Sequence, residues 1–181
     1  MQKNRSSWIL ILAAAVIATT LGAALSLYTF RTTPAADGAV EALWTSELRS
    51  PSGEIHATDA WRGKIVVINF WASWCPPCVE EMPDLNRSYE KYRSKNVVFV
   101  GIGVDSPSNI REFLSKTPVS YPIVLGGLEG GNWAKSLGNP SGGLPFTVLI
   151  DEKGSIKKTK LGKIDEVELN SWIDSAILPA K

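Results

Sequence analysis

The only two cysteines of this 181-residue chain, Cys75 and Cys78, lie three positions apart in the motif Trp-Cys-Pro-Pro-Cys. A pair at this spacing can form and open a disulfide reversibly, and no further cysteine remains for a structural brace. Half of a zinc site is the main alternative, but such a site needs four ligands and usually takes the others from a second pair. We therefore expect a working thiol pair, no metal, and no cofactor beyond the Cys75–Cys78 disulfide itself.

The motif opens a predicted amphipathic helix over residues 76–94. The first cysteine of such a helix lies where unpaired N–H groups and the positive end of the dipole favour thiolate, so Cys75 is the expected nucleophile and Cys78 the resolving thiol. Pro76 and Pro77 each lack an N–H, and no His or Lys lies between the cysteines. We therefore expect a moderately lowered pKa for Cys75 and a reducing potential.

The elements that must hold this motif follow from hydrophobic patterning. Residues 64–71 and 96–104 are apolar, β-branched runs, typical of strands buried on both faces of a parallel sheet. Strand, helix and strand in this order predict an α/β architecture. The remaining expected elements are an N-terminal hairpin (43–48 and 54–57), a central insertion (109–116, 121–125 and 132–137), a second hairpin (146–151 and 155–161) and a closing helix (165–178). Residues 43–181 are thus expected to form one domain, a mixed central β-sheet flanked by helices.

Residues 1–31 are predicted to be an N-terminal membrane anchor. Lys3 and Arg5 precede an uncharged run over residues 6–30, which as a helix would span about 37 Å at ~1.5 Å per residue, enough for a hydrocarbon core of about 30 Å. Basic residues ahead of the span favour a cytoplasmic N-terminus, so the domain would face the periplasmic side. The alternative is a cleaved signal peptide, with a candidate cleavage site at residues 24–26. Residues 32–42 have the composition of a linker.

Composition argues against other classes of protein. The formal net charge is +1, and the basic residues are scattered along the chain, so nothing supports nucleic-acid binding. The only histidine, His56, lies in the expected N-terminal hairpin and is interpreted as a surface residue rather than a catalytic base or zinc ligand.

Residues 69–78, NFWASWCPPC, followed by Pro83, resemble the thioredoxin superfamily, and residues 79–83, VEEMP, resemble its membrane-anchored TlpA/ResA-like branch, which includes cytochrome c maturation reductases. The resemblance covers residues 43–178 and includes LPFTVLID at 144–151. It implies a thioredoxin-like fold and thiol:disulfide oxidoreductase activity. It further implies apocytochrome c, or another exported protein, as the disulfide substrate and a membrane thiol transporter as the reductant.

The resemblance also implies roles outside the motif. Pro145 matches a cis proline beside the redox pair, and because a cis bond is plausible only before proline, Leu144 and Pro145 are the expected platform for a substrate strand. Thioredoxin carries a buried aspartate where this chain has Asn69. Glu81 lies three residues after Cys78 and matches a glutamate that TlpA/ResA-like proteins keep near the active site, so the resemblance implies that it tunes the thiol pKa values and takes the proton of Cys78. The alternative is a first-turn acid that only complements the helix dipole.

Trp74, next to the nucleophile, is expected to shape the contact surface for substrate together with Pro76 and Pro77. Phe146 departs from the threonine frequent after this proline in relatives. Two other functions remain open from the sequence: a reductase for copper-site assembly or general thiol homeostasis, and a non-enzymatic metal-binding module that uses the same two sulfurs. The lack of Met-rich or His-rich segments argues against the second.

Overall fold

The computed structural model describes residues 34–178 and, ahead of them, residues 12, 16, 19, 20 and 22. The chain divides into two compact units, Met1–Pro34 and Ala35–Lys181, and the fold below belongs to the second. Within the described residues, no helix combines the length and the apolar character needed to cross a bilayer. The anchor predicted over residues 1–31 falls almost entirely outside the described residues and stays a prediction.

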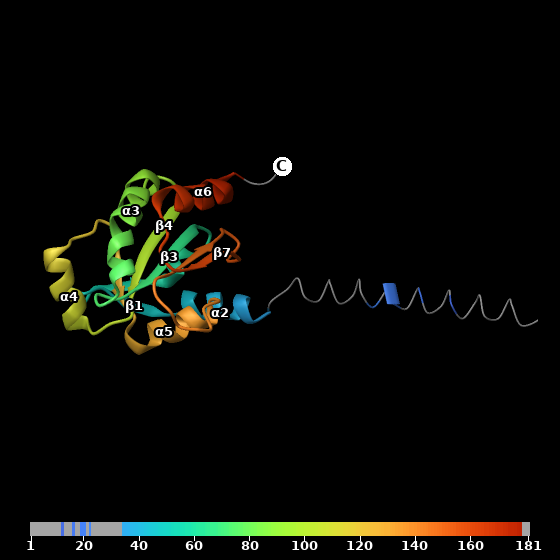
Figure 1. The fold of residues 1–181 in the computed structure, drawn as a ribbon, viewed down its shortest axis with the longest axis horizontal. Coiled ribbons are helices and arrows are strands. Elements are labelled where there is room, and N and C mark those ends of the chain that lie inside the picture. The colour runs from blue at the N-terminus through green and yellow to red at the C-terminus, as the bar shows by residue number, and fades with distance from the viewer. Residues whose placement is uncertain (1–11, 13–15, 17–18, 21, 23–33, 179–181) are drawn as a thin grey trace, which may run out of the picture. The chain divides into compact units, whose positions relative to one another are not determined.

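The described residues form a seven-stranded mixed sheet with the strand order β2-β1-β5-β4-β3-β6-β7 (Figure 1). The bounds are β1 Glu47–Arg49, β2 Ile55–Ala57, β3 Ile65–Trp71, β4 Val97–Gly103, β5 Ile123–Leu125, β6 Phe146–Ile150 and β7 Ile156–Leu161. Strands β3, β4 and β5 are parallel, whereas β6, β7 and the β1–β2 hairpin pair antiparallel with their neighbours. The predicted mixed sheet and both predicted hairpins are confirmed.

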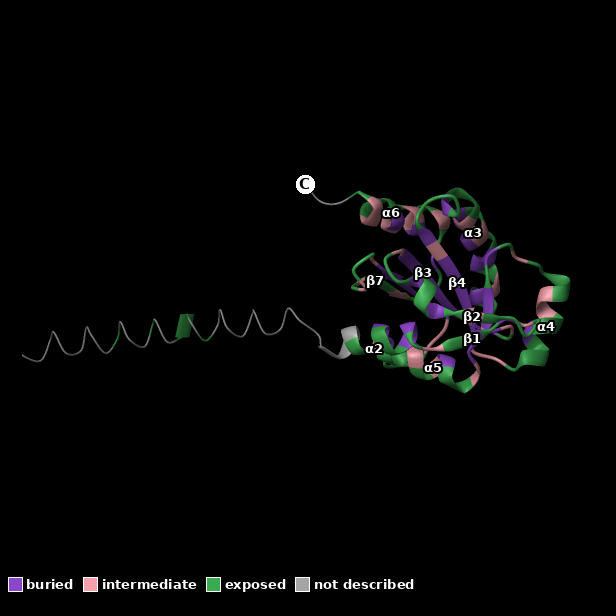
Figure 2. Cartoon of the chain, turned by 180° about the vertical axis from the view of Figure 1, so that it is seen from behind, coloured by how far each residue is buried: buried purple, intermediate pink, exposed green. Residues whose placement is uncertain are grey.

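Helices cover both faces of this sheet (Figure 1). Helices α3 (Pro76–Tyr92) and α6 (Glu166–Ile177) lie on one face, and α2 (Pro34–Trp44) and α5 (Gly127–Ser136) lie on the other. Helix α4 (Pro107–Lys116) adds Ile110 to the core beneath α3. Figure 2 shows that burial concentrates on the central strands, and every residue of β3 is buried. A strand of this kind gives the cysteine motif that follows it a rigid support.

Residues 34–42 were expected to be part of a linker, and this expectation is wrong, because they belong to α2. Small residues and proline suit a spacer, but alanine is also the best helix former and proline is tolerated in a first helical turn. The helix is held by burial of Val40, Leu43 and Trp44. Leu43 is therefore helical, and the first strand of the hairpin begins only at Glu47.

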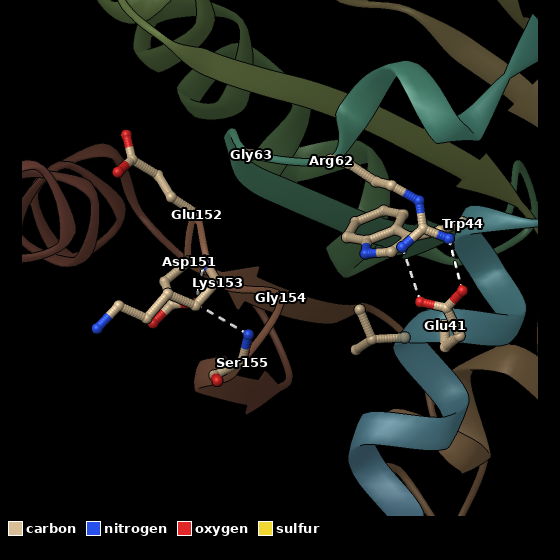
Figure 3. Close-up of a pocket in the computed structure, with 10 residues that line it drawn as sticks. Glu41, Trp44, Arg62, Gly63, Asp151, Glu152, Lys153, Gly154 and Ser155 are labelled. Carbon is tan, nitrogen blue, oxygen red and sulfur yellow. Dashed lines mark hydrogen bonds and ion pairs between the residues drawn. The ribbon is translucent and has the colours of Figure 1, made fainter.

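An ion pair also fastens α2. The guanidinium of Arg62, just before β3, donates two hydrogen bonds of 2.7 and 2.6 Å to the carboxylate of Glu41 (Figure 3). Both side chains are largely exposed, so this pair adds little to stability compared with the buried apolar contacts.

Thr58 makes a buried polar contact with the last turn of α2 and the residues that follow it. Its hydroxyl is fully buried and lies 2.6 Å from the Leu43 carbonyl oxygen and 2.7 Å from that of Ser46. We expect Thr58→Val to lower the free energy of unfolding by about 0.5–1.5 kcal/mol, because it removes the one hydroxyl proton that these two carbonyl oxygens share and leaves the Leu43 oxygen with only the Ser46 N–H as a donor. Thr58→Ser keeps the hydroxyl and should lose less. Denaturant unfolding of both variants measures the difference, and equal losses would contradict this role for the hydroxyl.

Candidate active site

Cys75 and Cys78 are joined by a disulfide, with their Cα atoms 5.3 Å apart, at the junction between β3 and α3. Cys75 is the N-cap residue of α3 and is 4% exposed, while Cys78, one turn into the helix, is fully buried. The expected difference in accessibility is therefore present. An incoming sulfur reaches Cys75 before it reaches Cys78.

The start of α3 offers few hydrogen-bond donors to the Cys75 sulfur. Pro76 and Pro77 occupy the first helical positions and have no N–H. The next two backbone N–H groups, of Cys78 and Val79, both donate to the Cys75 carbonyl oxygen, at 3.0 and 3.2 Å. A thiolate at Cys75 therefore lacks most of the backbone donors that a helix N-terminus usually presents.

The residues just before the nucleophile are clamped to the end of β4. The carboxylate of Asp105 accepts hydrogen bonds from the Ser73 N–H and hydroxyl with one oxygen, and from the Ser106 N–H and the Asn109 amide with the other. Burial alone would raise the pKa of Asp105, but these hydrogen bonds hold it below its usual value. Trp74, next in the chain, is 66% exposed. Asp105 thus holds the backbone at Ser73, and the next residue, Trp74, presents a large aromatic ring to solvent directly before Cys75 in the chain.

Glu81, three residues after Cys78 on α3, is fully buried. One carboxylate oxygen accepts a hydrogen bond from the Asn69 side-chain amide at 2.7 Å, and the other accepts one from the Ile164 backbone N–H at 2.8 Å. Burial raises the pKa of Glu81 to about 7, against the hydrogen bonds from Ile164 and Asn69 and the charges of Lys163 and Lys160, which lower it. A carboxyl group in this range can accept and return a proton at neutral pH.

The neighbouring Glu80 behaves differently. It is exposed, and its carboxylate lies 3.3 Å from the Lys163 ammonium. An acid that served only the helix dipole would also be expected at the surface, as Glu80 is. Glu81 is instead fully buried between β3 and the segment after β7, which favours a role inside the protein over a role that only complements the helix dipole.

The peptide bond between Leu144 and Pro145 is cis, as expected. Pro145 is buried directly before β6, whose first residue, Phe146, pairs with Phe70 of β3. Leu144 is half-buried and packs against the apolar cluster that contains Cys75 and Cys78. The sheet register therefore brings the predicted platform and the cysteine pair to the same region.

Two contributors were not found from the sequence. The backbone N–H of Ile164 and the clamp between Ser73 and Asp105 join segments far apart in the chain, and neither has a local signature in the sequence. His56, by contrast, lies half-buried on β2, which is four strands away from β3 in the sheet order. It pairs there with Leu48 of β1.

A hollow of about 360 Å³ lies between α2, the Arg62–Gly63 turn and the β6–β7 turn (Figure 3). These elements lie where β3 begins and β6 ends, whereas the cysteines follow the end of β3. The hollow is therefore at the opposite end of the sheet from the redox pair.

Comparison with known proteins agrees with this geometry. The Redoxin family profile matches residues 34–173. The thiol-disulfide oxidoreductase ResA of Geobacillus thermodenitrificans is 32% identical over 124 residues, which cover 68% of this chain and 69% of the relative. ResA of Halalkalibacterium halodurans is 30% identical over 179 residues, which cover 96% of this chain and 97% of the relative.

Solved structures show the same fold. A thioredoxin-related protein from Neisseria meningitidis serogroup B superposes with a TM-score of 0.65 at 35% identity, over 72% of this chain and 98% of the other. The fold and the site therefore define a thioredoxin-like thiol-disulfide oxidoreductase with a redox-active Cys75–Cys78 pair. The chain belongs to the Redoxin family and is a TlpA/ResA-like member of the thioredoxin superfamily.

The buried acid makes stability depend on pH in a defined direction. Because the folded-state pKa of Glu81 is raised from 4.5 to about 7, the folded state binds more protons than the unfolded state between these values. The contribution of Glu81 to the free energy of unfolding of the oxidised protein should therefore fall as pH rises through this window, by about 1.4 kcal/mol per pH unit and about 3 kcal/mol in total, and level off above pH ~7.

Glu81→Gln removes this titration, so the difference in unfolding free energy between wild type and variant should show the window. Denaturant unfolding between pH 4 and 9 measures it, and the disulfide keeps the cysteines from titrating. A difference that stays constant over this range would contradict the assignment.

Proposed function

We propose that this protein reduces disulfides in exported proteins on the outer side of a cytoplasmic membrane, with the Cys-x-x-Cys-His haem sites of apocytochrome c as its substrates. Cys75 is the attacking sulfur, Cys78 resolves the mixed disulfide, and Glu81 handles the proton. A membrane thiol transporter returns the pair to the dithiol state. The relatives named ResA support the chemistry, and the TlpA/ResA-like resemblance motivates the substrate and the transporter.

The observation that carries the reducing direction is the shortage of donors around the nucleophile. A thiol pair is a strong oxidant when its reduced form is stabilised, chiefly as a thiolate. Here Pro76 and Pro77 have no N–H to offer, and the N–H groups of Cys78 and Val79 point at a carbonyl oxygen. The reduced form gains little from the helix terminus, so the pair gives up its electrons readily.

The reaction balances with the groups present. The Cys75 thiolate attacks one sulfur of the substrate disulfide and forms a mixed disulfide, and the other substrate sulfur leaves as a thiolate. Cys78 passes its proton to Glu81 and attacks the Cys75 sulfur, which releases the second substrate sulfur. Two electrons move to the substrate and the Cys75–Cys78 disulfide remains. Glu81 then returns the proton when the pair is reduced again.

The surface around Cys75 suits a polypeptide. Trp74, Pro76 and Pro77 are exposed, and Leu144 is half-buried beside the cluster that contains the cysteines. Together they offer rigid, largely apolar contact area on both sides of the nucleophile. The outward placement of the domain is proposed from Lys3, Arg5 and the uncharged run that follows them.

The direct test compares substrates and variants of the purified protein. Wild type should reduce an oxidised peptide that carries Cys-x-x-Cys-His, and insulin more slowly, while Cys75→Ser should reduce neither. Cys78→Ser should accumulate mixed disulfides in cells, and the attached proteins identify the substrates. A reduction potential near that of strong periplasmic oxidants, about −120 mV, would overturn the reducing direction.

Restoring a donor at the helix start should make the pair more oxidising. Pro77→Ala adds one N–H in the first turn of α3, which stabilises the Cys75 thiolate, lowers its pKa and raises the potential by about 30 mV, a tenfold change in the exchange equilibrium. Pro107→Ala, which adds an N–H at the start of α4 instead, is the matched control. Redox titration against glutathione measures both, and an unchanged potential in Pro77→Ala would refute the donor argument.

A further inference from the structure

The segment Gly162–Ile164, between β7 and α6, contacts both halves of the redox site. The Gly162 N–H donates a 2.8 Å hydrogen bond to the carbonyl oxygen of Pro145. Two residues later, the Ile164 N–H donates a 2.8 Å hydrogen bond to the carboxylate of Glu81. Three consecutive residues thus join the predicted substrate platform to the buried acid.

This segment is short and held at its ends. Leu161, at the end of β7, pairs with Phe146, so Gly162 follows directly from the strand beside the cis proline. Gly162 has a φ of +97°, a conformation that strongly favours glycine. Ile164 is fully buried in the same cluster as the cysteines, and Asp165 caps α6. Little slack is left to absorb a displacement of the Pro145 carbonyl.

Charged groups on the same side act on Glu81. Lys163, inside the segment, pairs at 3.3 Å with Glu80, and Lys160 on β7 pairs with Glu168 of α6. Both ammonium groups lower the pKa of Glu81, in opposition to burial. The other groups that act on this carboxyl are the Asn69 amide of β3, the Ile164 N–H, and Tyr121, whose own pKa is raised by burial and by the Glu81 charge.

We propose that Gly162–Ile164 is a positioning element that couples a polypeptide docked at Leu144–Pro145 to the protonation state of Glu81. This inference rests on the proposed function, because it takes Pro145 as the docking platform and Glu81 as the proton acceptor. When a substrate strand pairs beside Pro145 and shifts its carbonyl, Gly162 follows and the bond from Ile164 to Glu81 lengthens.

The direction of the coupling suits the reaction. A carboxylate that loses a backbone N–H donor becomes a stronger base. Glu81 would therefore gain affinity for a proton just when the mixed disulfide has formed and Cys78 must lose one. Without substrate, the intact hydrogen bond keeps Glu81 a weaker base, so that Cys78 stays protonated and does not attack.

The test uses the full chain with Cys78→Ser, in which an adduct on Cys75 is stable. One sample carries a peptide of about eight residues as a mixed disulfide, and the other carries 2-mercaptoethanol, which has no polypeptide backbone to pair beside Pro145. The titration midpoint of the Glu81 carboxyl is followed by carbon NMR. We expect the midpoint to be about one pH unit higher with the peptide than with the small adduct.

Four further variants in this background separate coupling from a general disturbance. Gly162→Ala, which disfavours the observed φ, should abolish the difference between the two adducts. Lys163→Gln should raise both midpoints equally, and Lys163→Arg should restore them. Lys158→Gln, at an exposed position of β7, should leave both midpoints unchanged.

The outcomes distinguish the two proposals. Equal midpoints with peptide and small adduct, in a protein that still reduces the peptide when Cys78 is present, would overturn the coupling and leave the proposed function intact. Failure of the peptide to form a mixed disulfide on Cys75 would overturn both.

Discussion

The carboxyl group of Glu81 is the point at which three distant segments of the chain meet. Left alone in the protein interior it would be costly to ionise, and it is tolerated because Asn69 and Ile164 each direct an N–H at one of its oxygens. Helix α3 is thereby fixed to β3 and to the connection between β7 and α6. Because the cysteine pair opens the same helix, the position of the sulfurs depends on this side chain, and in the mechanism that we propose so does the handling of the proton.

In the mechanism that we propose, the two cysteines are controlled from different directions. Cys75 lies at a helix start whose first two residues are prolines, so its sulfur receives little help from the backbone. Cys78 is fully buried one turn later, and in this mechanism it loses its proton to Glu81. A reducing pair needs a nucleophile that is not strongly stabilised as thiolate and a resolving thiol that becomes reactive at the right step, and this separation provides both.

Patterns along the sequence predicted much of this arrangement. Buried apolar runs located β3 and β4, and the spacing of apolar residues located α3, because these signals are local. The cis bond at Pro145 followed from the resemblance together with the rule that such bonds need proline. The hydrogen bond from Ile164 to Glu81 could not be found in this way. Ile164 is 83 residues distant in the chain and contributes only a backbone N–H, which every residue but proline has. Helix α2 was missed because its small residues suit a spacer and a helix equally well.

The last strand of the sheet, β7, leaves one of its sides without a neighbouring strand among the described residues. If extended polypeptides bind beside Pro145 as we propose, the same kind of pairing along this border would lead to self-association. Lys157 and Lys158 are exposed on β7, and charge of this kind discourages another chain from adding to a sheet. At the opposite border β2 is only three residues long, too short to be an attractive template. Both borders of the sheet therefore discourage edge-to-edge association, which leaves the surface next to the cysteines as the place for strand-like pairing in the mechanism that we propose.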